Sequence, residues 1–357
     1  MFRPLHETDP WDSVRRRRLF VRRRSERAFN MTSGNSQADR RLEFALALKA
    51  EGDYLAAASA LEQVLELAPD WAAAHFTLGE VREAACQRDA AIAAYAACLV
   101  RDPDDVMGAG VRLALMGATP MPAALPEAYV QTLFDQYAPA FERSLLGNLS
   151  YRAPRQLREA VESLISAEAK WARVLDIGCG TGLAGEVFRG RAAWLEGVDL
   201  SAGMVAVAGR KKLYDQLETA EAVGFLGDLA DASYDFAVAA DVVIYMGDLA
   251  PLFTGVARIL KPGALFALTT QRGEGEGYLL GGEHRFSHSV PYLRRIAAGA
   301  GLEVALLRDA VCRTEKGQDV PSLVCVLRKP VPAMEVLPGS LPPGRRSGSR
   351  EPGSMPV

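Results

Sequence analysis

The chain has 357 residues, 49% of them hydrophobic and 24% charged, as in an ordinary globular protein of about two domains. The formal charge is −3, but residues 1–30 contribute +5 and residues 331–357 contribute +1, so residues 31–330 carry −9. This acidic body excludes nucleic acid as a first choice of partner, and the absence of a long apolar run predicts no membrane partner.

The five cysteines are scattered, odd in number and without any C-x-x-C pair. The pattern argues against a disulfide framework and against a structural zinc site, and it fits a reducing compartment. We therefore expect no metal and a cytoplasmic location. Four of the cysteines are expected to be small buried side chains, namely Cys86, Cys98, Cys312 and Cys325.

Both ends of the chain are predicted to be disordered. Residues 1–37 form a basic leader, whose four acidic residues argue against a transit peptide. Met31 opens a polar stretch and is a candidate start, in which case the arginine run before it is either foreign to the native protein or a weak anionic contact. Residues 330–357 are rich in Pro, Gly and Ser and predict a disordered tail.

Residues 38–117 show a repeat with a period of 34: Pro69 and Pro103 are one period apart, as are Ala57 and Ala91. Small alanines let antiparallel helices approach closely, and the prolines end each unit. The segment resembles the tetratricopeptide repeat, although its first unit lacks the usual Leu-Gly pair. The resemblance implies a small all-α domain that binds a protein or peptide on its concave face. The alternative is a helical cap on the surface of an enzyme.

Residues 118–127 contain three prolines and predict a linker. Further on, the apolar run 172–177 ends in GCGTG before a helical pattern, which is typical of a strand-to-helix turn where a ligand approaches the backbone. The spacing differs from the G-x-G-x-x-G of dinucleotide sites, and Asp176 would repel a pyrophosphate but attract the ammonium and sulfonium of S-adenosylmethionine. Twenty-one residues after Gly178, a second strand ends in Asp199, which can accept from both ribose hydroxyls.

Over residues 128–329 these features resemble the class I S-adenosylmethionine-dependent methyltransferase family, and the whole chain resembles a bacterial group that joins it to tetratricopeptide repeats. The resemblance implies an α/β fold, namely a Rossmann-like sheet of seven strands with helices on both faces. A small all-α repeat domain precedes it in the chain. The resemblance also implies S-adenosylmethionine as cofactor. The residues expected to bind it are Asp176, Gly178, Cys179 through its backbone, Gly180, Gly182, Asp199, Leu200, Glu221, Ala222, Asp241, Val242, Tyr137 and Tyr151.

The expected reaction is an in-line displacement, which needs no protein nucleophile. A base is needed only if the acceptor must lose a proton. The candidate catalytic residues are His288, in a glycine-rich insertion after the fifth strand, and Tyr245, which the resemblance places beside the methyl donor. The alternative for His288 is a structural hydrogen bond beside the following helix. The insertion itself is expected to be a mobile lid.

The expected function is methyl transfer to a small-molecule, carrier-bound or protein acceptor, with the repeats docking a partner or substrate. No NPPY-like segment follows the fourth strand, which weighs against methylation of amino groups in bases or glutamine, and no acidic triad indicates magnesium. Two alternatives stay open. One is a non-catalytic tetratricopeptide adaptor with a cofactor-binding, methyltransferase-like domain. The other is an NAD-linked oxidoreductase, which the loop spacing disfavours.

Overall fold

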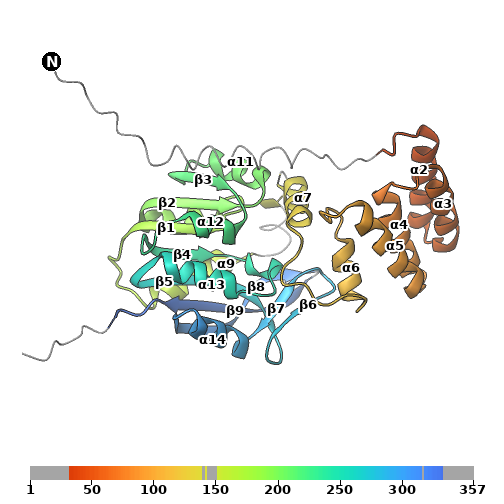
Figure 1. Ribbon diagram of the computed structural model, residues 1–357. Helices are drawn as coiled ribbons and strands as arrows, with labels where there is room; N and C mark the ends of the chain where they lie inside the picture. Colours follow the sequence, from red (N-terminus) through yellow and green to blue (C-terminus); the bar gives the residue numbers. More distant parts are fainter. Residues whose placement is uncertain (1–31, 139–140, 143–150, 316, 333–357) are drawn as a thin grey trace, which may run out of the picture.

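The chain folds into an all-α segment followed by an α/β domain (Figure 1). The computed structural model describes residues 32–138, 141–142, 151–315 and 317–332. Almost all of the predicted leader and tail lie outside these residues. The first helix begins at Ser36, because the Asn35 side chain accepts hydrogen bonds from the backbone N–H groups of Gln37 and Ala38 and so caps the helix. The expected leader, 1–37, therefore extends two residues into this helix.

Antiparallel helices stack at the N-terminal side of the described chain (Figure 1). They are α2 (Ser36–Glu51), α3 (Tyr54–Leu67), α4 (Ala72–Ala84), α5 (Arg88–Arg101) and α6 (Ala109–Leu115). A Cβ added at Gly79 in α4 would lie 2.5 Å from the ring of Tyr95 in α5, so only glycine allows this close packing. The period of 34 thus corresponds to two helical pairs, and α6 is the expected third element that covers the end of the stack.

The helical stack packs directly on the α/β domain. Val111 of α6 shares a buried cluster with Leu125, just before the next helix, and with Phe286 of the α/β domain. The backbone N–H of Leu125 donates to the carbonyl of Tyr245 at 3.0 Å. The proline-rich segment that predicts a linker is therefore attached to the α/β domain along part of its length.

The α/β domain is built on a mixed sheet with the strand order β3-β2-β1-β4-β5-β7-β6, and β9 pairs with both β5 and β8. Its strands are β1 (Trp171–Ile177), β2 (Ala192–Asp199), β3 (Gln216–Thr219), β4 (Tyr234–Ala239), β5 (Leu260–Gly273), β6 (Tyr278–Leu280), β7 (Phe286–Ser289), β8 (Glu303–Glu315) and β9 (Gln318–Arg328). Strands β1 to β5 are parallel, whereas β9 runs antiparallel to β5 and β8. The Rossmann-like α/β class predicted from the sequence is confirmed.

Within the described residues the sheet has nine strands, not the seven expected. The additional two are β6 and β7, which come from the glycine-rich insertion after β5. They pair with each other as an antiparallel hairpin, and β7 also pairs in parallel with the end of β5. Leu280 and Phe286 are buried, so the apolar residues of the insertion hold it in the sheet. The glycine-rich composition on which the prediction of a mobile lid rests does not reveal these two short strands.

Helices cover both faces of the sheet (Figure 1). One buried cluster joins the sheet to α12 (Ala222–Asp228), α13 (Ala250–Ile259) and α14 (Val290–Gly299). A second cluster joins the opposite face to α9 (Ala153–Glu162) and α10 (Leu183–Phe188). The remaining elements are α7 (Glu127–Tyr137), α11 (Ala202–Arg210) and the short 3-10 turns η2 (Arg189–Arg191) and η3 (Val243–Tyr245). Burial on both faces explains why β1 and β4 read as continuous apolar runs.

All five cysteines are free thiols. Cys98, Cys312 and Cys325 are buried, as expected, but Cys86 is exposed. It stands in the turn between α4 and α5 with a φ of 58°, a left-handed conformation that turns favour. A position with this backbone lies at the surface of the stack, so the prediction of a buried thiol was wrong there.

Candidate functional site

A cavity of about 440 Å³ lies where β1, β2 and β4 end. In open parallel sheets, ligands bind at the carboxyl ends of the strands, at the point where the strand order reverses, and here that point is β1 between β2 and β4. The cavity is lined by most of the residues predicted from the sequence, namely Tyr137, Tyr151, Gly178, Cys179, Gly180, Asp199, Leu200, Glu221, Ala222, Asp241, Val242 and Tyr245. Asp176, Gly182 and His288 are not among its lining residues.

The loop after β1 owes its shape to glycine. Gly178, Gly180 and Gly182 have φ values of 64°, 52° and 92°, all in the left-handed region. A Cβ at Gly178 would come within 2.3 Å of the Val242 side chain, whereas a Cβ at Gly180 would meet no atom within 4 Å. The loop therefore packs against Val242 and presents bare backbone to the cavity, as a ligand-binding turn requires.

Asp199 holds two neighbouring loops together. One carboxylate oxygen accepts the Gly180 N–H and the other accepts the Ser201 N–H, each at 2.8 Å. Ser201 in turn donates its hydroxyl to Asp135 of α7 at 2.5 Å, which fixes α7 beside the cavity. Burial raises the pKa of Asp199. A carboxylate has about four lone-pair sites, so Asp199 can still accept hydrogen bonds from a ligand's hydroxyls.

Glu221 lies at the start of α12, on the same side of the cavity as β2 and β3. Its side chain accepts the backbone N–H groups of Val223 at 2.8 Å and Gly224 at 2.6 Å, so it caps the helix. This capping fixes the carboxylate next to Ala222 at the rim of the cavity. The arrangement fits the adenine position that the resemblance implies for this pair.

Aromatic side chains form a further wall. The ring of Phe141 makes edge contacts with Tyr137 and Phe134, with centroids 5.6 and 6.0 Å apart, and Phe134 contacts Tyr245 at 5.2 Å. Burial raises the pKa of Tyr151 well above its usual value, so its phenol is neutral. Together these rings place an apolar, water-excluding surface opposite the glycine loop.

Asp176 lies behind the glycine loop and is only 1% exposed. Its Oδ2 accepts a hydrogen bond of 2.6 Å from the Tyr214 hydroxyl, and among the described residues its Oδ1 has no partner. Burial, with a contribution from Asp199, raises the pKa of Asp176 to about 7. Since Asp176 does not line the cavity, its position favours an influence through its charge over the direct contact with a bound cation that the sequence suggests.

The buried Asp176 carboxyl predicts a pH-dependent stability. A carboxyl with a raised pKa binds its proton more tightly in the folded state, so the free energy of unfolding should fall as the pH rises from about 4 to 7. The expected slope from this group is ~1.4 kcal/mol per pH unit. Asp176→Asn keeps an oxygen that can accept from Tyr214 and should flatten this dependence. Guanidinium unfolding of both proteins at pH 5 and pH 7 measures the difference, and parallel slopes would contradict it.

At the end of β4, Asp241 has a φ of 58°, an uncommon conformation for a residue other than glycine and one that often marks functional sites. Its carboxylate is held on both sides. Oδ2 accepts a 2.8 Å hydrogen bond from Arg313, and Oδ1 accepts one of 3.2 Å from the hydroxyl of Thr269. Burial raises the pKa of the Tyr245 phenol, and this effect exceeds the opposing effect of the neighbouring Arg285.

The structure does not bring His288 to the cavity. Its ring is fully buried, with Nδ1 2.7 Å from the Thr270 hydroxyl and Nε2 2.9 Å from the carbonyl of Met246. Burial lowers its pKa to about 4, so the ring is neutral and its Nε2–H donates to the carbonyl. This geometry contradicts a role as general base. It fits the alternative of a structural hydrogen bond, because the apolar residues of the β6–β7 hairpin carry His288 into the core.

The structure adds Arg285, Arg313 and Tyr214 to the residues in and around the cavity, none of which was among the site residues predicted from the sequence. The apolar stretch of residues 302–307 predicts a strand, but β8 continues to Glu315 through charged residues, so no local apolar pattern marks Arg313. No local pattern marks Tyr214 either, since its contact with Asp176 joins residues 38 apart.

In the described part of the chain, no group of three or more His, Cys, Asp or Glu side chains is arranged to hold a metal ion. Nor is any helix in that part long and apolar enough to cross a membrane.

Comparison with known families agrees with this division of the chain. Residues 175–268 match the family described as "Methyltransferase domain", and residues 48–112 match the family described as "Tetratricopeptide repeat". The first range covers the glycine loop, Asp199 and Asp241, and the second covers α3, α4 and α5 with the end of α2 and the start of α6. S-adenosylmethionine is accordingly the cofactor of this domain.

Several curated proteins are similar to part of the chain. An O-methyltransferase, rstn1, of Aspergillus nomiae is 29% identical over 160 residues, which are 39% of this chain and 69% of that protein. A ubiquinone biosynthesis O-methyltransferase of Thiobacillus denitrificans is 29% identical over 189 residues, which are 44% of this chain and 78% of that protein. Among solved structures, the [4+2]-cyclase SpnF aligns with a TM-score of 0.49 at 19% identity, over 59% of this chain and 98% of that one.

Proposed function

Since the chain is a class I methyltransferase preceded by a tetratricopeptide-repeat region, we propose that it transfers the methyl group of S-adenosylmethionine to an oxygen atom of its acceptor. Its similarity to proteins named O-methyltransferases supports oxygen as the acceptor atom. One observation carries the proposal: a single cavity extends from Asp199 at the end of β2 to Tyr245 after β4. It thus offers one side to the cofactor and another to the acceptor.

The residues of the cavity fit this cofactor. Gly178 and Gly180 let its amino-acid portion approach the backbone, and Asp199 offers carboxylate oxygens to the ribose hydroxyls. Asp176, whose pKa is raised to about 7, lies behind the loop, and a cationic ligand would favour its ionised form, so the two charges stabilise each other. S-adenosylmethionine supplies, when bound, a methyl group on a positively charged sulfur.

The chain's own contribution is alignment and exclusion of water. The C–O bond forms as the S–C bond breaks, the sulfur leaves as a neutral thioether, and no protein nucleophile takes part. Holding both reactants in line can account for about 7 to 11 kcal/mol of barrier lowering. The aromatic wall keeps water away from the reacting atoms. A base is needed only for an acceptor hydroxyl that is not yet ionised, and Asp241, the carboxylate at the end of β4, is a weak base there because Arg313 and Thr269 donate hydrogen bonds to it.

Two measurements test the proposal. Titration calorimetry with S-adenosylhomocysteine should show binding to the full chain. Labelled methyl groups should then enter one fraction of an extract from a strain that lacks the protein, resolved into protein, lipid and small molecules. Base releases the label as methanol from an O-methyl ester, and hot hydroiodic acid releases it as methyl iodide from an O-methyl ether under conditions that leave N-methyl groups in place. Binding without transfer to any fraction would favour the adaptor alternative instead.

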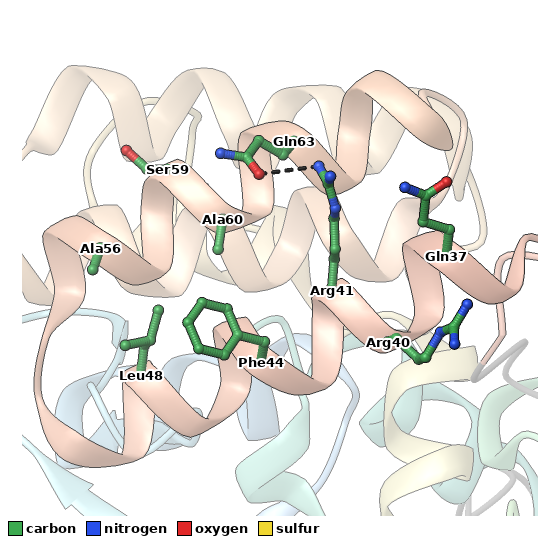
Figure 2. A pocket seen from close by; sticks show the side chains of 9 residues that line it. All are labelled: Gln37, Arg40, Arg41, Phe44, Leu48, Ala56, Ser59, Ala60 and Gln63. Atoms are coloured by element: carbon green, nitrogen blue, oxygen red, sulfur yellow. Dashed lines mark hydrogen bonds between the residues drawn. The ribbon is translucent and has the colours of Figure 1, made fainter.

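We also propose that the repeats dock a protein segment in a groove of about 500 Å³ between α2 and α3 (Figure 2). Four apolar residues form its floor, namely Phe44, Leu48, Ala56 and Ala60. Polar residues rim it, namely Gln37, Arg40, Arg41, Ser59 and Gln63. The Phe44 side chain is 61% exposed, which is unusual for a large aromatic residue, and the two arginines favour an acidic amphipathic helix as the occupant.

Phe44→Ser tests this groove. Because Phe44 is exposed, the substitution should leave the free energy of unfolding within about 0.5 kcal/mol of the parent. Binding of an acidic amphipathic helical peptide to the full chain, measured by titration calorimetry, should weaken about tenfold, as expected when a contact aromatic residue is lost. Val100→Ser, which removes a 77% exposed apolar residue outside the groove, is the matched control. Equal peptide binding by both variants would remove the groove from the docking role.

A further inference from the structure

Arg313 combines deep burial with an unfilled hydrogen-bonding group. It lines the cavity, yet it is only 2% exposed. Its Nη1 donates to Asp241 at 2.8 Å and its Nε donates to Glu315 at 3.0 Å. Among the described residues, no group accepts from its Nη2. A buried guanidinium nitrogen without a partner is costly, and native proteins keep such groups mainly where a ligand or water completes them.

A second arginine lies beside it. Arg285 also lines the cavity, and its Nη1 donates to the same Glu315 oxygen that accepts from Arg313. Two guanidinium groups thus share one carboxylate oxygen, and their positive charges repel each other. Asp241 and Glu315 balance the charges of the two arginines, so the cluster of four side chains is neutral. The free Nη2 of Arg313 is therefore suited to a singly charged anion and not to a more highly charged one.

The position of the pair separates it from the cofactor side of the cavity. Asp199 and Glu221 follow β2 and β3, at one side of β1. Arg285 directly precedes β7 and Arg313 lies on β8. In the strand order, both of these strands lie on the opposite side of β1 from β2 and β3, beyond β4. The rest of the cavity lining is largely apolar and aromatic and includes Phe134 and Tyr245, whose rings are in edge contact. A ligand that reaches the arginines from the methyl donor therefore has an apolar body and an acidic end.

We propose that Arg313 and Arg285 bind a carboxylate group of the methyl acceptor, which makes the acceptor a hydroxy acid with an apolar or aromatic body. This assignment rests on the proposed methyltransferase function. The free Nη2 of Arg313 can donate a charge-assisted hydrogen bond to a carboxylate oxygen, and a singly charged group suits this neutral cluster better than a phosphate of higher charge. A carboxylate paired with arginine is a weakened nucleophile, so it anchors the acceptor while a hydroxyl oxygen elsewhere in the molecule receives the methyl group.

A matched pair of probes tests the anchor on the full chain. With S-adenosylhomocysteine saturating, titration calorimetry compares 3-hydroxybenzoate with 3-hydroxybenzamide, which differ in the charge of one group. We expect the acid to bind at least tenfold more tightly than the amide. Arg313→Gln should abolish this preference, and Arg285→Gln, at a less buried position, should reduce it about threefold. Arg272→Gln breaks an exposed arginine–carboxylate pair with Asp309 of β8 and should leave the preference unchanged.

The cofactor also carries a carboxylate, so a second arm separates the two sources. S-adenosylhomocysteine is compared with 5′-methylthioadenosine, which lacks the amino-acid portion. If Arg313→Gln weakens only S-adenosylhomocysteine and leaves the acid preference intact, the arginines bind the cofactor and the inference is overturned. Equal binding of acid and amide, or binding of neither, to a protein that still binds S-adenosylhomocysteine also overturns it but leaves the proposed function standing. Failure to bind S-adenosylhomocysteine refutes the proposed function itself. Should Arg313→Gln not fold, Arg285→Gln decides.

Discussion

Asp199→Ala is expected to weaken the binding of S-adenosylhomocysteine by about 2 to 3 kcal/mol, or roughly 30- to 150-fold. Two losses add together. The substitution removes the carboxylate that faces the ribose in the proposed site, and it frees the N–H groups of Gly180 and Ser201 that Asp199 holds at 2.8 Å. The glycine loop then loses its link to β2. Titration calorimetry at neutral pH measures the change directly.

Asp228→Ala provides the control, because Asp228 is an exposed carboxylate at the end of α12, outside the cavity lining. Its affinity for S-adenosylhomocysteine should equal that of the parent. Asp199→Asn adds a finer comparison. An amide can accept through one oxygen only, so its NH₂ must face either Gly180 or Ser201, and we expect an affinity close to that of the alanine variant. Unchanged affinity for Asp199→Ala would show that the ribose lies elsewhere.

Gly178→Ala should destabilise the fold by about 2 to 4 kcal/mol, from two distinct causes. The φ of 64° is unfavourable for any residue with a Cβ. In addition, the new Cβ would lie 2.3 Å from Val242, so either the loop or the end of β4 must move. Because both segments line the cavity, binding of S-adenosylhomocysteine should be lost together with stability. Chemical unfolding, followed by calorimetry on the folded fraction, measures both effects.

A double-mutant cycle separates the two causes. Val242→Ala removes the clashing side chain, so the pair Gly178→Ala and Val242→Ala should recover about 1 to 3 kcal/mol as coupling energy, while the strain in φ remains. Gly180→Ala is the matched single variant. It has a φ of 52° but no atom within 4 Å of the new Cβ, so only the conformational cost of about 1 to 2 kcal/mol applies to its stability. Equal destabilisation at both glycines would exclude the clash with Val242.

Local sequence patterns predicted those elements whose signal is periodic. The period of 34 indicated the helical pairs, because Ala57 and Ala91 must sit where two helices approach, and a repeat leaves the same trace in each unit. The Asp-x-Gly-x-Gly-x-Gly spacing indicated a ligand-binding turn, since only glycine adopts three left-handed conformations so close together. In both cases the structural demand acts within a short stretch of chain.

The errors arose where long-range packing decides. Nothing near His288 in sequence shows that Thr270 and Met246 will enclose its ring, because these residues are 18 and 42 positions away. A histidine after a glycine-rich loop suggested a base, but the buried Phe286 two residues earlier carries it into the core. The prediction of a buried thiol at Cys86 was wrong in the opposite direction, because the turn conformation of this residue brings it to the surface.

The sequence by itself indicated the order of the repeat and methyltransferase regions, the cofactor class and the glycine loop and strand-end acids of the cavity, because glycine spacing and strand-end acids act locally and recur in fixed positions. Only the tertiary structure brought together the arginine cluster that we propose binds the acceptor. Arg285, Arg313, Asp241 and Glu315 come from three separate segments, and their pairing depends on how the end of β4, the start of β7 and β8 are set next to one another. When oppositely charged side chains on different strands pair with one another, the sequence of each single strand shows no pattern that predicts the pairing.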